Sequence, residues 1–221
     1  TGCQWSLLPR DFPPFTTVQR YFYDWRNGGL LRAINHLLVM AARELEGREA
    51  SPSAGVIDSQ SVKTTESGGP RGFDAGKRIK GRKRHIVTDT LGLMVGAVVH
   101  PASVQDRDGA PMVLRSIRKS WPWLRHVFAD GGYAGPKLRG ALKREGDWRI
   151  EIIKRSDAAR GFEVLPRRWV VERTFAWLGR CRRMAKDWEA SIASAEAWLL
   201  IAHIRIMIRR LARFHAGPVE L

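Results

Sequence analysis

The segment VIDSQSVKT (residues 56–64) begins with β-branched apolar residues and places the acidic residue Asp58 where that run ends. A short β-branched run that follows a Ser-Pro-Ser boundary predicts a strand, which we assign to residues 55–59. The segment VFADGGYAG (residues 127–135) has a similar pattern, because Asp130 follows an apolar run and precedes a Gly-Gly turn. Both acidic residues are therefore expected at the ends of strands.

The rest of the chain predicts an alternation of strands and helices around these two segments. The predicted strands after the first are residues 85–89, 93–99, 126–129 and 148–153, and the predicted helices are residues 108–120, 136–144, 166–183 and 190–214. This order, β-β-β-α-β-α-β-α, resembles a ribonuclease-H-like fold, an α/β fold in which helices flank a mixed five-stranded sheet. In such a sheet Asp58 lies on the central first strand and Asp130 follows the fourth strand beside it. Their carboxylates can then share cations that lie roughly 4 Å apart.

The beginning of the chain is predicted to be mostly helical. One helix starts in TVQRYFYDW with Thr16 or Thr17 as its cap and ends at Asn27-Gly28-Gly29, and a second covers residues 30–47. Two helices around a glycine turn are typical of half of a helix-turn-helix and equally of plain scaffold. The sequence leaves these two interpretations open.

A Ser-Pro-Ser stretch at residues 51–53 marks a boundary. We therefore divide the chain into a helical N-terminal segment, residues 1–50, and a larger domain, residues 51–221. Within the larger domain, residues 68–81 are rich in glycine and basic residues and are predicted to form a loop.

The charge of the chain is strongly positive. Its 221 residues include 38 Lys and Arg against 22 Asp and Glu, a formal net charge of +16. The cations are clustered in residues 71–84, in residues 167–183 and on the last predicted helix, at Arg205, Arg209, Arg210 and Arg213. Clustered cations gain affinity for nucleic acid because they release the counterions of its phosphates. The composition therefore indicates a nucleic-acid partner rather than an evenly solvated surface.

Several other classes of protein are disfavoured by the sequence. The two cysteines, Cys3 and Cys181, are far apart and lack CxxC spacing, so we expect a reducing cytoplasm and neither a zinc site nor a disulfide framework. No apolar stretch approaches the roughly 18 residues of a membrane span, and no signal peptide is visible. We therefore expect no membrane partner. Because the chain begins with Thr1, we also expect it to be part of a longer protein.

A third acidic residue, Glu172, lies in the basic helical stretch RRWVVERTFAWLGR (residues 167–180). Asp58, Asp130 and Glu172 offer carboxylate oxygens from three separate elements, and such hard ligands are what Mg²⁺ and Mn²⁺ prefer. Phosphodiester chemistry with two divalent cations needs these ligands, together with cationic side chains that hold the polyanionic substrate. The three residues are therefore the predicted metal-binding and catalytic site.

Three blocks of sequence around these acidic residues support a resemblance to a known family. They are VIDSQSVKTTESGGPRGFDAGKRIKGRKRHIVTDTLG, FADGGYAG and RRWVVERTFAWLGRCRRMAKDWE. In this order the blocks resemble the IS5 family of insertion-sequence transposases, a branch of the IS4-like DDE transposases. The resemblance implies that Asp58, Asp130 and Glu172 form a DDE triad that binds two Mg²⁺ ions, for which Mn²⁺ can substitute. It further implies cleavage of DNA at the ends of the element, strand transfer into target DNA, a homodimer on DNA and a nucleoid location in a bacterial cytoplasm.

The chain departs from the IS4-like pattern, which places Tyr, Arg, Glu and Lys on the helix of the catalytic Glu. Arg168 matches the Arg position, but Leu165 stands at the Tyr position and Gly179 at the Lys position. Arg173 and Arg180 are the candidates to replace the missing contacts. Because members of the family begin further upstream, we expect a helical DNA-binding portion to precede this chain.

Eight cationic residues are candidates for contact with the DNA backbone. They are Lys63, Lys80, Arg82, Lys83, Arg84, Arg168, Arg173 and Arg180. We expect structural roles for Asp89, Asp106 and Asp108, which lie at a turn or before a helix, and core packing for Trp169 and Trp177.

Two other functions fit parts of this pattern. A truncated transposase that no longer cuts would remain a DNA-binding protein, which the start of the chain at Thr1 leaves open. A structure-selective nuclease on the same fold would cut DNA regardless of inverted repeats. The intact set of three acidic residues disfavours the first function, and the long match to one transposase family disfavours the second.

Overall fold

The computed structural model describes residues 3–146, 148–153 and 165–216. The strands are β1 (Ala54–Lys63), β2 (Gly72–Asp74), β3 (Ile79–Asp89), β4 (Met94–Pro101), β5 (His126–Ala129) and β6 (Arg149–Ile152). The helices are α1 (Phe15–Asn27), α2 (Leu30–Leu45), α3 (Asp106–Ile117), α4 (Pro136–Glu145), α5 (Pro166–Gly179) and α6 (Ile192–Ala216). Three short 3₁₀ helices complete the list: η1 (Trp5–Leu7), η2 (Gly131–Tyr133) and η3 (Arg182–Met184).

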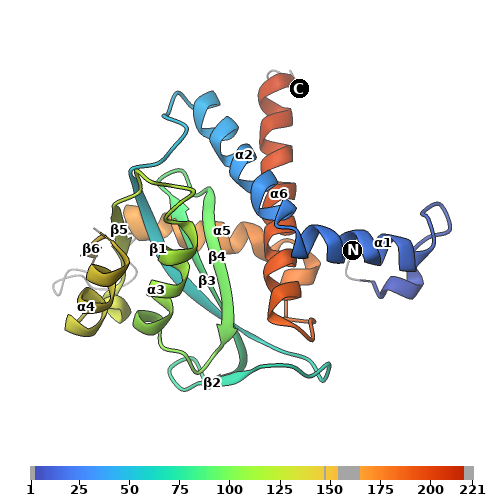
Figure 1. The fold of residues 1–221 in the computed structure, drawn as a ribbon, viewed down its shortest axis with the longest axis horizontal. Coiled ribbons are helices and arrows are strands. Elements are labelled where there is room, and N and C mark those ends of the chain that lie inside the picture. The colour runs from blue at the N-terminus through green and yellow to red at the C-terminus, as the bar shows by residue number, and fades with distance from the viewer. Residues whose placement is uncertain (1–2, 147, 154–164, 217–221) are drawn as a thin grey trace.

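The sheet is mixed, and β1 lies at its centre (Figure 1). On one side β1 pairs antiparallel with β3, which in turn pairs antiparallel with β4. On the other side it pairs in parallel with β5, and β5 pairs in parallel with β6. This arrangement, with helices packed on the sheet, confirms the predicted ribonuclease-H-like α/β fold.

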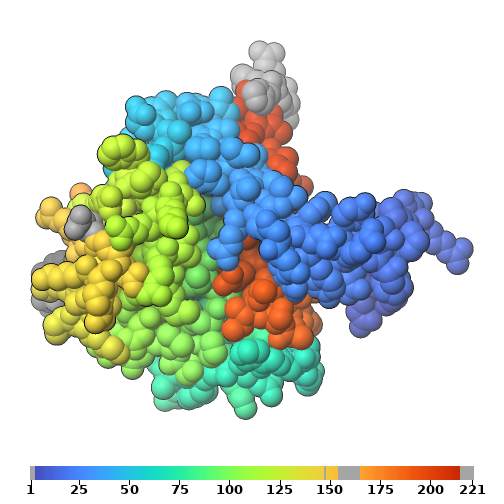
Figure 2. Space-filling view, viewed as in Figure 1, coloured from blue at the N-terminus to red at the C-terminus, as the bar shows by residue number. Residues whose placement is uncertain are grey.

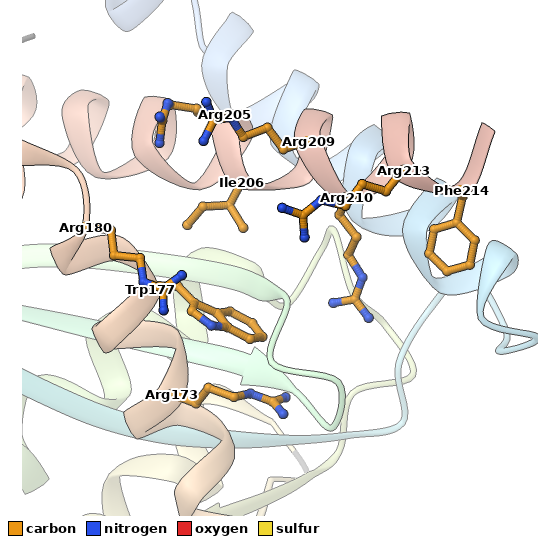
Figure 3. Close-up of a pocket in the computed structure, with 9 residues that line it drawn as sticks. All are labelled: Arg173, Trp177, Arg180, Arg205, Ile206, Arg209, Arg210, Arg213 and Phe214. Atoms are coloured by element: carbon orange, nitrogen blue, oxygen red, sulfur yellow. The ribbon is translucent and has the colours of Figure 1, made fainter. Parts of the chain in front are cut away.

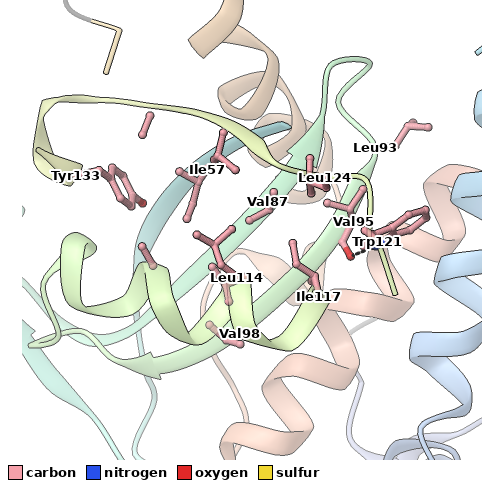
Figure 4. Packing of buried hydrophobic residues seen from close by; sticks show 14 of the residues in the cluster. Ile57, Val87, Leu93, Val95, Val98, Leu114, Ile117, Trp121, Leu124 and Tyr133 are labelled. Atoms are coloured by element: carbon pink, nitrogen blue, oxygen red, sulfur yellow. Dashed lines mark hydrogen bonds between the residues drawn. The ribbon is translucent and has the colours of Figure 1, made fainter. Parts of the chain in front are cut away.

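Helices cover both faces of the sheet because β1 is apolar on both of its sides. Side chains alternate along a strand, so Ile57 packs with α3 and α4, whereas Val56 packs with α5 and α6. Figure 4 shows the first of these cores, where Leu114 and Ile117 of α3 lie over Ile57 and the neighbouring strands. Trp121, at the end of this layer, donates its indole N–H to the carbonyl of Val95. The second core lies on the opposite face of the sheet, which α5 crosses.

A buried polar cluster attaches α2 to the body of the molecule. Asn35 of α2 donates its amide to the carbonyl of Met94 at 2.9 Å, and the N–H of Met94 donates to Nε2 of His203 at 3.0 Å. Nδ1 of His203 therefore carries the proton, and it donates to the Asn35 side-chain oxygen at 2.6 Å. Burial lowers the pKa of His203 to about 3, so the ring is neutral. This packing supports the scaffold interpretation for α2.

The N-terminal helix α1 is less enclosed than α2 and projects from the body of the molecule (Figure 2). The predicted caps of this helix are wrong. It begins at Phe15, one residue before Thr16, and no side chain caps it. The predicted break at the glycines is confirmed, because Gly29 adopts a left-handed conformation with φ 74° and α2 starts at the next residue.

The predicted loop at residues 68–81 is partly wrong, because β2 and the start of β3 lie within it. The sheet therefore has six strands rather than five. Gly81 shows why this basic segment forms a strand: a Cβ atom there would lie 2.0 Å from the Val62 carbonyl oxygen of β1. Glycine thus permits the close approach of β3 to β1.

The remaining elements agree with the sequence except at their ends. The predicted helix at residues 166–183 ends earlier, at Gly179, and a separate turn, η3, follows it. The predicted helix at residues 108–120 begins two residues earlier, at Asp106. Among the helices of the described residues, none is both long enough and apolar enough to cross a membrane.

We predict that Asn35→Ala lowers the free energy of unfolding by about 1–3 kcal/mol, because it leaves a buried carbonyl and a buried imidazole N–H without partners. Urea unfolding followed by circular dichroism would measure the loss. The matched control is Leu37→Ala on the same helix, where the side chain is 60% exposed and the expected change is below about 0.5 kcal/mol. Equal losses in the two variants would contradict a structural role for the polar cluster.

Candidate active site

Asp58 and Asp130 lie at the same level of two neighbouring strands. β1 and β5 pair in parallel with Val56 opposite Phe128, and each acidic residue follows two positions later. The prediction that these two residues lie beside each other is therefore confirmed. Because side chains alternate along β1, Asp58 points to the same face as Val56, which is the face covered by α5.

The environment of Asp58 disfavours its negative charge. Burial raises the pKa of this carboxyl to about 6, and the negative charges of Asp130 and Asp106 add to the effect. The N–H of Ser59, which donates to the carboxylate at 2.7 Å, and the ammonium of Lys77 act in the opposite direction. The ionised carboxylate of Asp58 is therefore disfavoured mainly by its burial, and a bound cation would stabilise it.

The Asp130 side chain is held by the turn that follows β5. It accepts the N–H of Gly132 at 2.8 Å and so caps η2. This bond orients the carboxylate at the strand end. The Gly131-Gly132 sequence thus contributes a turn, as predicted, while the carboxylate remains about one-third exposed at 32%.

Glu172 approaches this pair from α5, with Arg168 between them. One nitrogen of the Arg168 guanidinium lies 3.4 Å from Glu172 and 3.8 Å from Asp130. The side chain of Glu172 is 49% exposed. Within the described residues, no three His, Cys, Asp or Glu side chains lie close enough together to hold a metal ion. Arg168 therefore connects two of the three predicted ligands, Asp130 and Glu172.

Asp106 is a residue whose place the sequence did not reveal. It accepts the Ser59 hydroxyl at 2.7 Å and the Lys83 ammonium at 2.8 Å, on the face of the sheet opposite to Asp58. Burial alone would raise its pKa, but the hydrogen bonds from Lys83 and Ser59 lower it below the ordinary value. The structural role predicted for Asp106 is confirmed, and its charge also acts on Asp58. The position of Asp106 before a helix did not predict its effect on the pKa of Asp58.

A chain of buried rings supports the same region. Nδ1 of His100 donates to the Pro101 carbonyl, so Nε2 of His100 accepts from Nδ1 of His85 at 3.4 Å. Nε2 of His85 then accepts the Tyr133 hydroxyl at 2.8 Å. Burial is the main cause that lowers the pKa of His85 to about 3, in agreement with a neutral ring. Since Tyr133 ends the turn after Asp130, the chain of rings ties that turn to β3. Gly109 of α3 leaves room for the two imidazoles, because a Cβ there would lie 2.5 Å from His85.

Three of the predicted DNA contacts are wrong because their side chains are buried. Arg82 is 0% exposed, pairs with Asp187 at 3.1 Å and donates to main-chain carbonyls on both sides of the sheet edge. Arg84 donates to carbonyls in residues 184–186. Lys83 is held by Asp106 and by Asp74. Arg82 and Arg84 thus attach the segment after α5 to β3, whereas Lys83 binds Asp106 on the face of the sheet opposite to Asp58. Because these three cations are bound within the fold, they are not available to a ligand.

The other five predicted cations divide into three locations. Lys63 and Lys80 are exposed near the ends of β1 and β3. Arg168 lies between two carboxylates. Arg173 and Arg180 line a cleft between α5 and α6, which is shown in Figure 3.

The two tryptophans on α5 also differ from the prediction. Trp169 is 42% exposed and Trp177 lines the cleft, so neither is an enclosed core residue. Their rings lie on either side of the Arg173 guanidinium, at 4.8 and 4.6 Å from its carbon. The basic residues around them gave no sequence signal for this stacking, because it depends on side-chain conformation.

Comparison with known proteins identifies the family of the chain. A family model described as "Transposase DDE domain" matches residues 49–207, which include Asp58, Asp130 and Glu172. The chain belongs to this family. A "Putative transposase for insertion sequence element IS402" from Burkholderia cepacia is 36% identical to the chain over 113 residues. That match covers 47% of the chain and 52% of the relative, so it spans about half of the relative's length.

For this DDE-domain protein we predict that Asp58→Asn raises the free energy of unfolding at pH 8, without divalent cations, by about 1–3 kcal/mol. The folded-state pKa of Asp58 is raised from 3.8 to about 6, so its ionised form destabilises the fold above that pH. The gain should disappear as the pH falls towards 4, where the wild-type carboxyl is protonated in the folded state. Chemical unfolding at several pH values would measure both effects.

The control for this experiment is Asp24→Asn, which removes the same charge from an exposed position on α1. It should change the free energy of unfolding by less than about 0.5 kcal/mol at each pH. A destabilised Asp58→Asn protein, or a gain that does not depend on pH, would show that the ionised Asp58 carboxylate does not destabilise the fold.

Proposed function

We propose that this chain contains the catalytic domain of a transposase of the IS5 family. It cuts DNA at the ends of an insertion sequence and joins those ends to target DNA. The observation that carries the proposal is the parallel pairing of β1 with β5, which sets Asp58 beside Asp130 on the face where α5 presents Glu172. Membership of the DDE transposase family supports the same three residues as the catalytic set.

The chemistry of these residues fits two divalent cations, Mg²⁺ or Mn²⁺. Carboxylate oxygens are the ligands that these ions prefer. Burial and, to a lesser extent, the neighbouring acidic residues raise the pKa of Asp58, and the Arg168 guanidinium already occupies a position between Asp130 and Glu172. A positive charge therefore already lies between two of the predicted ligands. When bound, the two ions supply an activated oxygen nucleophile and neutralise charge on the leaving oxygen.

The three acidic residues and Arg168 have distinct parts in this mechanism. Asp58, within β1, and Asp130, directly after β5, hold their ligand oxygens on two paired strands, which limits the separation of these oxygens. Glu172 contributes the third carboxylate from α5. For Glu172 to join the other two, Arg168 leaves the space between the carboxylates and faces a phosphate of the substrate instead. No covalent link between protein and DNA is required.

The partner in this proposal is duplex DNA, both at the ends of the element and at the target. Two ends must be cut and joined together, so two copies of the domain act as a homodimer on DNA. This activity places the protein in the bacterial cytoplasm, at the nucleoid. The exposed Lys63 and Lys80 remain candidate contacts with the DNA backbone.

We predict that a labelled duplex that ends in the element's own inverted repeat is nicked at the repeat boundary in Mg²⁺. Asp58→Asn, Asp130→Asn and Glu172→Gln should each slow this nicking by about 10²–10⁴-fold, because each removes a charged ligand worth several kcal/mol in the transition state. All three should still bind the duplex. Gel electrophoresis of the labelled strands measures the rate.

The control variant is Glu151→Gln, because Glu151 forms surface pairs with Arg167 and His126 and lies outside the candidate site. It should nick at nearly the wild-type rate. Binding without a nick in the wild type would identify a non-catalytic DNA-binding remnant. Equal nicking of a duplex with a scrambled end would identify a structure-selective nuclease instead.

A further inference from the structure

A large cationic cleft lies between α5 and α6 (Figure 3). Its volume is about 760 Å³, and its walls carry six arginines together with the apolar side chains of Trp177, Ile206 and Phe214. The arginines are Arg173 and Arg180 on α5 and Arg205, Arg209, Arg210 and Arg213 on α6. The cleft is separate from the three predicted metal ligands, although one of its walls is the helix that carries Glu172.

The positive charge of this cleft is almost uncompensated. In the part of the chain that the structure describes, the one ion pair that any of these arginines makes is that of Arg210 with Glu46, at 2.7 Å. Arg173 donates to the Leu91 carbonyl at 3.0 Å and stacks on two tryptophan rings, which fixes its position without neutralising it. Burial, together with the positive charge of Arg210, lowers the pKa of Arg173. Like charges held this close are unfavourable unless an anion joins them.

The spacing of the α6 arginines matches a nucleic-acid backbone. Arg205, Arg209 and Arg213 are four residues apart and therefore share one face of the helix. Eight residues of helix span about 12 Å. Along the axis of a DNA duplex, that length covers three to four phosphates of one strand, at about 3.4 Å each. A single small anion would use one or two of these guanidinium groups, whereas a phosphate backbone uses the whole row.

The cleft shares helix α5 with the candidate active site. Arg173, in its wall, is the residue after Glu172, and Trp177 and Arg180 follow on the same side of α5. The exposed ring of Trp169, one turn before Arg173 on α5, stacks on that arginine.

We propose that the cleft between α5 and α6 binds the phosphate backbone of duplex DNA, with Arg205, Arg209 and Arg213 contacting successive phosphates of one strand. The identity of the polyanion as DNA rests on the proposed function. The cleft is a binding site and takes no part in the chemical step.

The test compares two triple variants of the full chain in binding to a labelled duplex of about 30 base pairs. Fluorescence anisotropy is measured in a metal chelator, between about 50 and 200 mM salt. R205A/R209A/R213A removes the α6 row. R139A/K143A/R144A removes the same charge from exposed positions on α4, outside the cleft. Circular dichroism melting of each protein confirms that it is folded.

The α6 variant should bind about 10- to 100-fold more weakly and should lower the slope of log affinity against log salt by about 2–3, since each lost phosphate contact contributes about 0.9. The α4 variant should change that slope by less than about 1. R205K/R209K/R213K keeps the charges and should retain most of the wild-type slope. Loss of binding in that lysine variant, or equal losses in the α6 and α4 variants, would overturn the inference.

This outcome is independent of the outcome for the proposed function. Because binding is measured without metal ions, a protein that never cuts DNA can still show the α6-specific loss. In that case the cleft is a DNA site and the proposed chemistry fails. Conversely, Mg²⁺-dependent nicking together with equal slopes for the two alanine variants would retain the proposed function and refute the cleft.

Discussion

The parallel pairing of β1 with β5 is the contact on which the rest of the candidate site depends. It brings Asp58 and Asp130, which are 72 positions apart in the sequence, to the same level of adjacent strands. This arrangement disfavours the ionised form of Asp58, because burial and the neighbouring acidic residues raise its pKa to about 6. Contacts on the other face of the sheet support the site, because Asp106 bonds to Ser59 beside Asp58 and Tyr133, after Asp130, bonds to His85. Two carboxylates are thereby kept in a position that favours a cation.

The positive charge of the chain serves two different purposes. Buried cations such as Arg82 and Arg84 satisfy carbonyls of the segment after α5 and hold it on β3. Exposed arginines on α5 and α6 form a cleft with little compensating negative charge. A net charge of +16 therefore overstates the surface that is available to a polyanion. Only the exposed arginines are available as a binding surface, because the buried cations already have partners within the fold.

Much of the fold could be predicted from local patterns in the sequence. The strands that carry Asp58 and precede Asp130 begin with short apolar runs, so their existence and order follow from periodicity. The predicted end of the first strand at residue 59 is wrong, because β1 extends from Ala54 to Lys63 and Asp58 lies within it. The position of Asp58 beside Asp130 then follows from the topology of the fold class. The helix of Glu172 was also predicted, although it ends at Gly179, four residues before the expected end.

Other features depend on contacts between distant residues and left no local signal. The basic run before His85 suggested a solvated loop, yet Arg82 is fully buried because Asp187 and several carbonyls, more than 100 residues away in the chain, surround it. Asp106 affects Asp58 only because α3 packs under β1. The cleft requires α6 to cross near α5, which spacing within either helix cannot show.

The most direct test of the proposed catalytic site is a crystal structure of the chain soaked with Mn²⁺ in the presence of a DNA end, analysed by anomalous scattering. The account predicts two Mn²⁺ ions about 4 Å apart. Asp58 and Asp130 would hold them, Glu172 would be a ligand, and the Arg168 guanidinium would have moved to a phosphate. Mn²⁺ bound elsewhere, with Arg168 still between Asp130 and Glu172, would contradict the account.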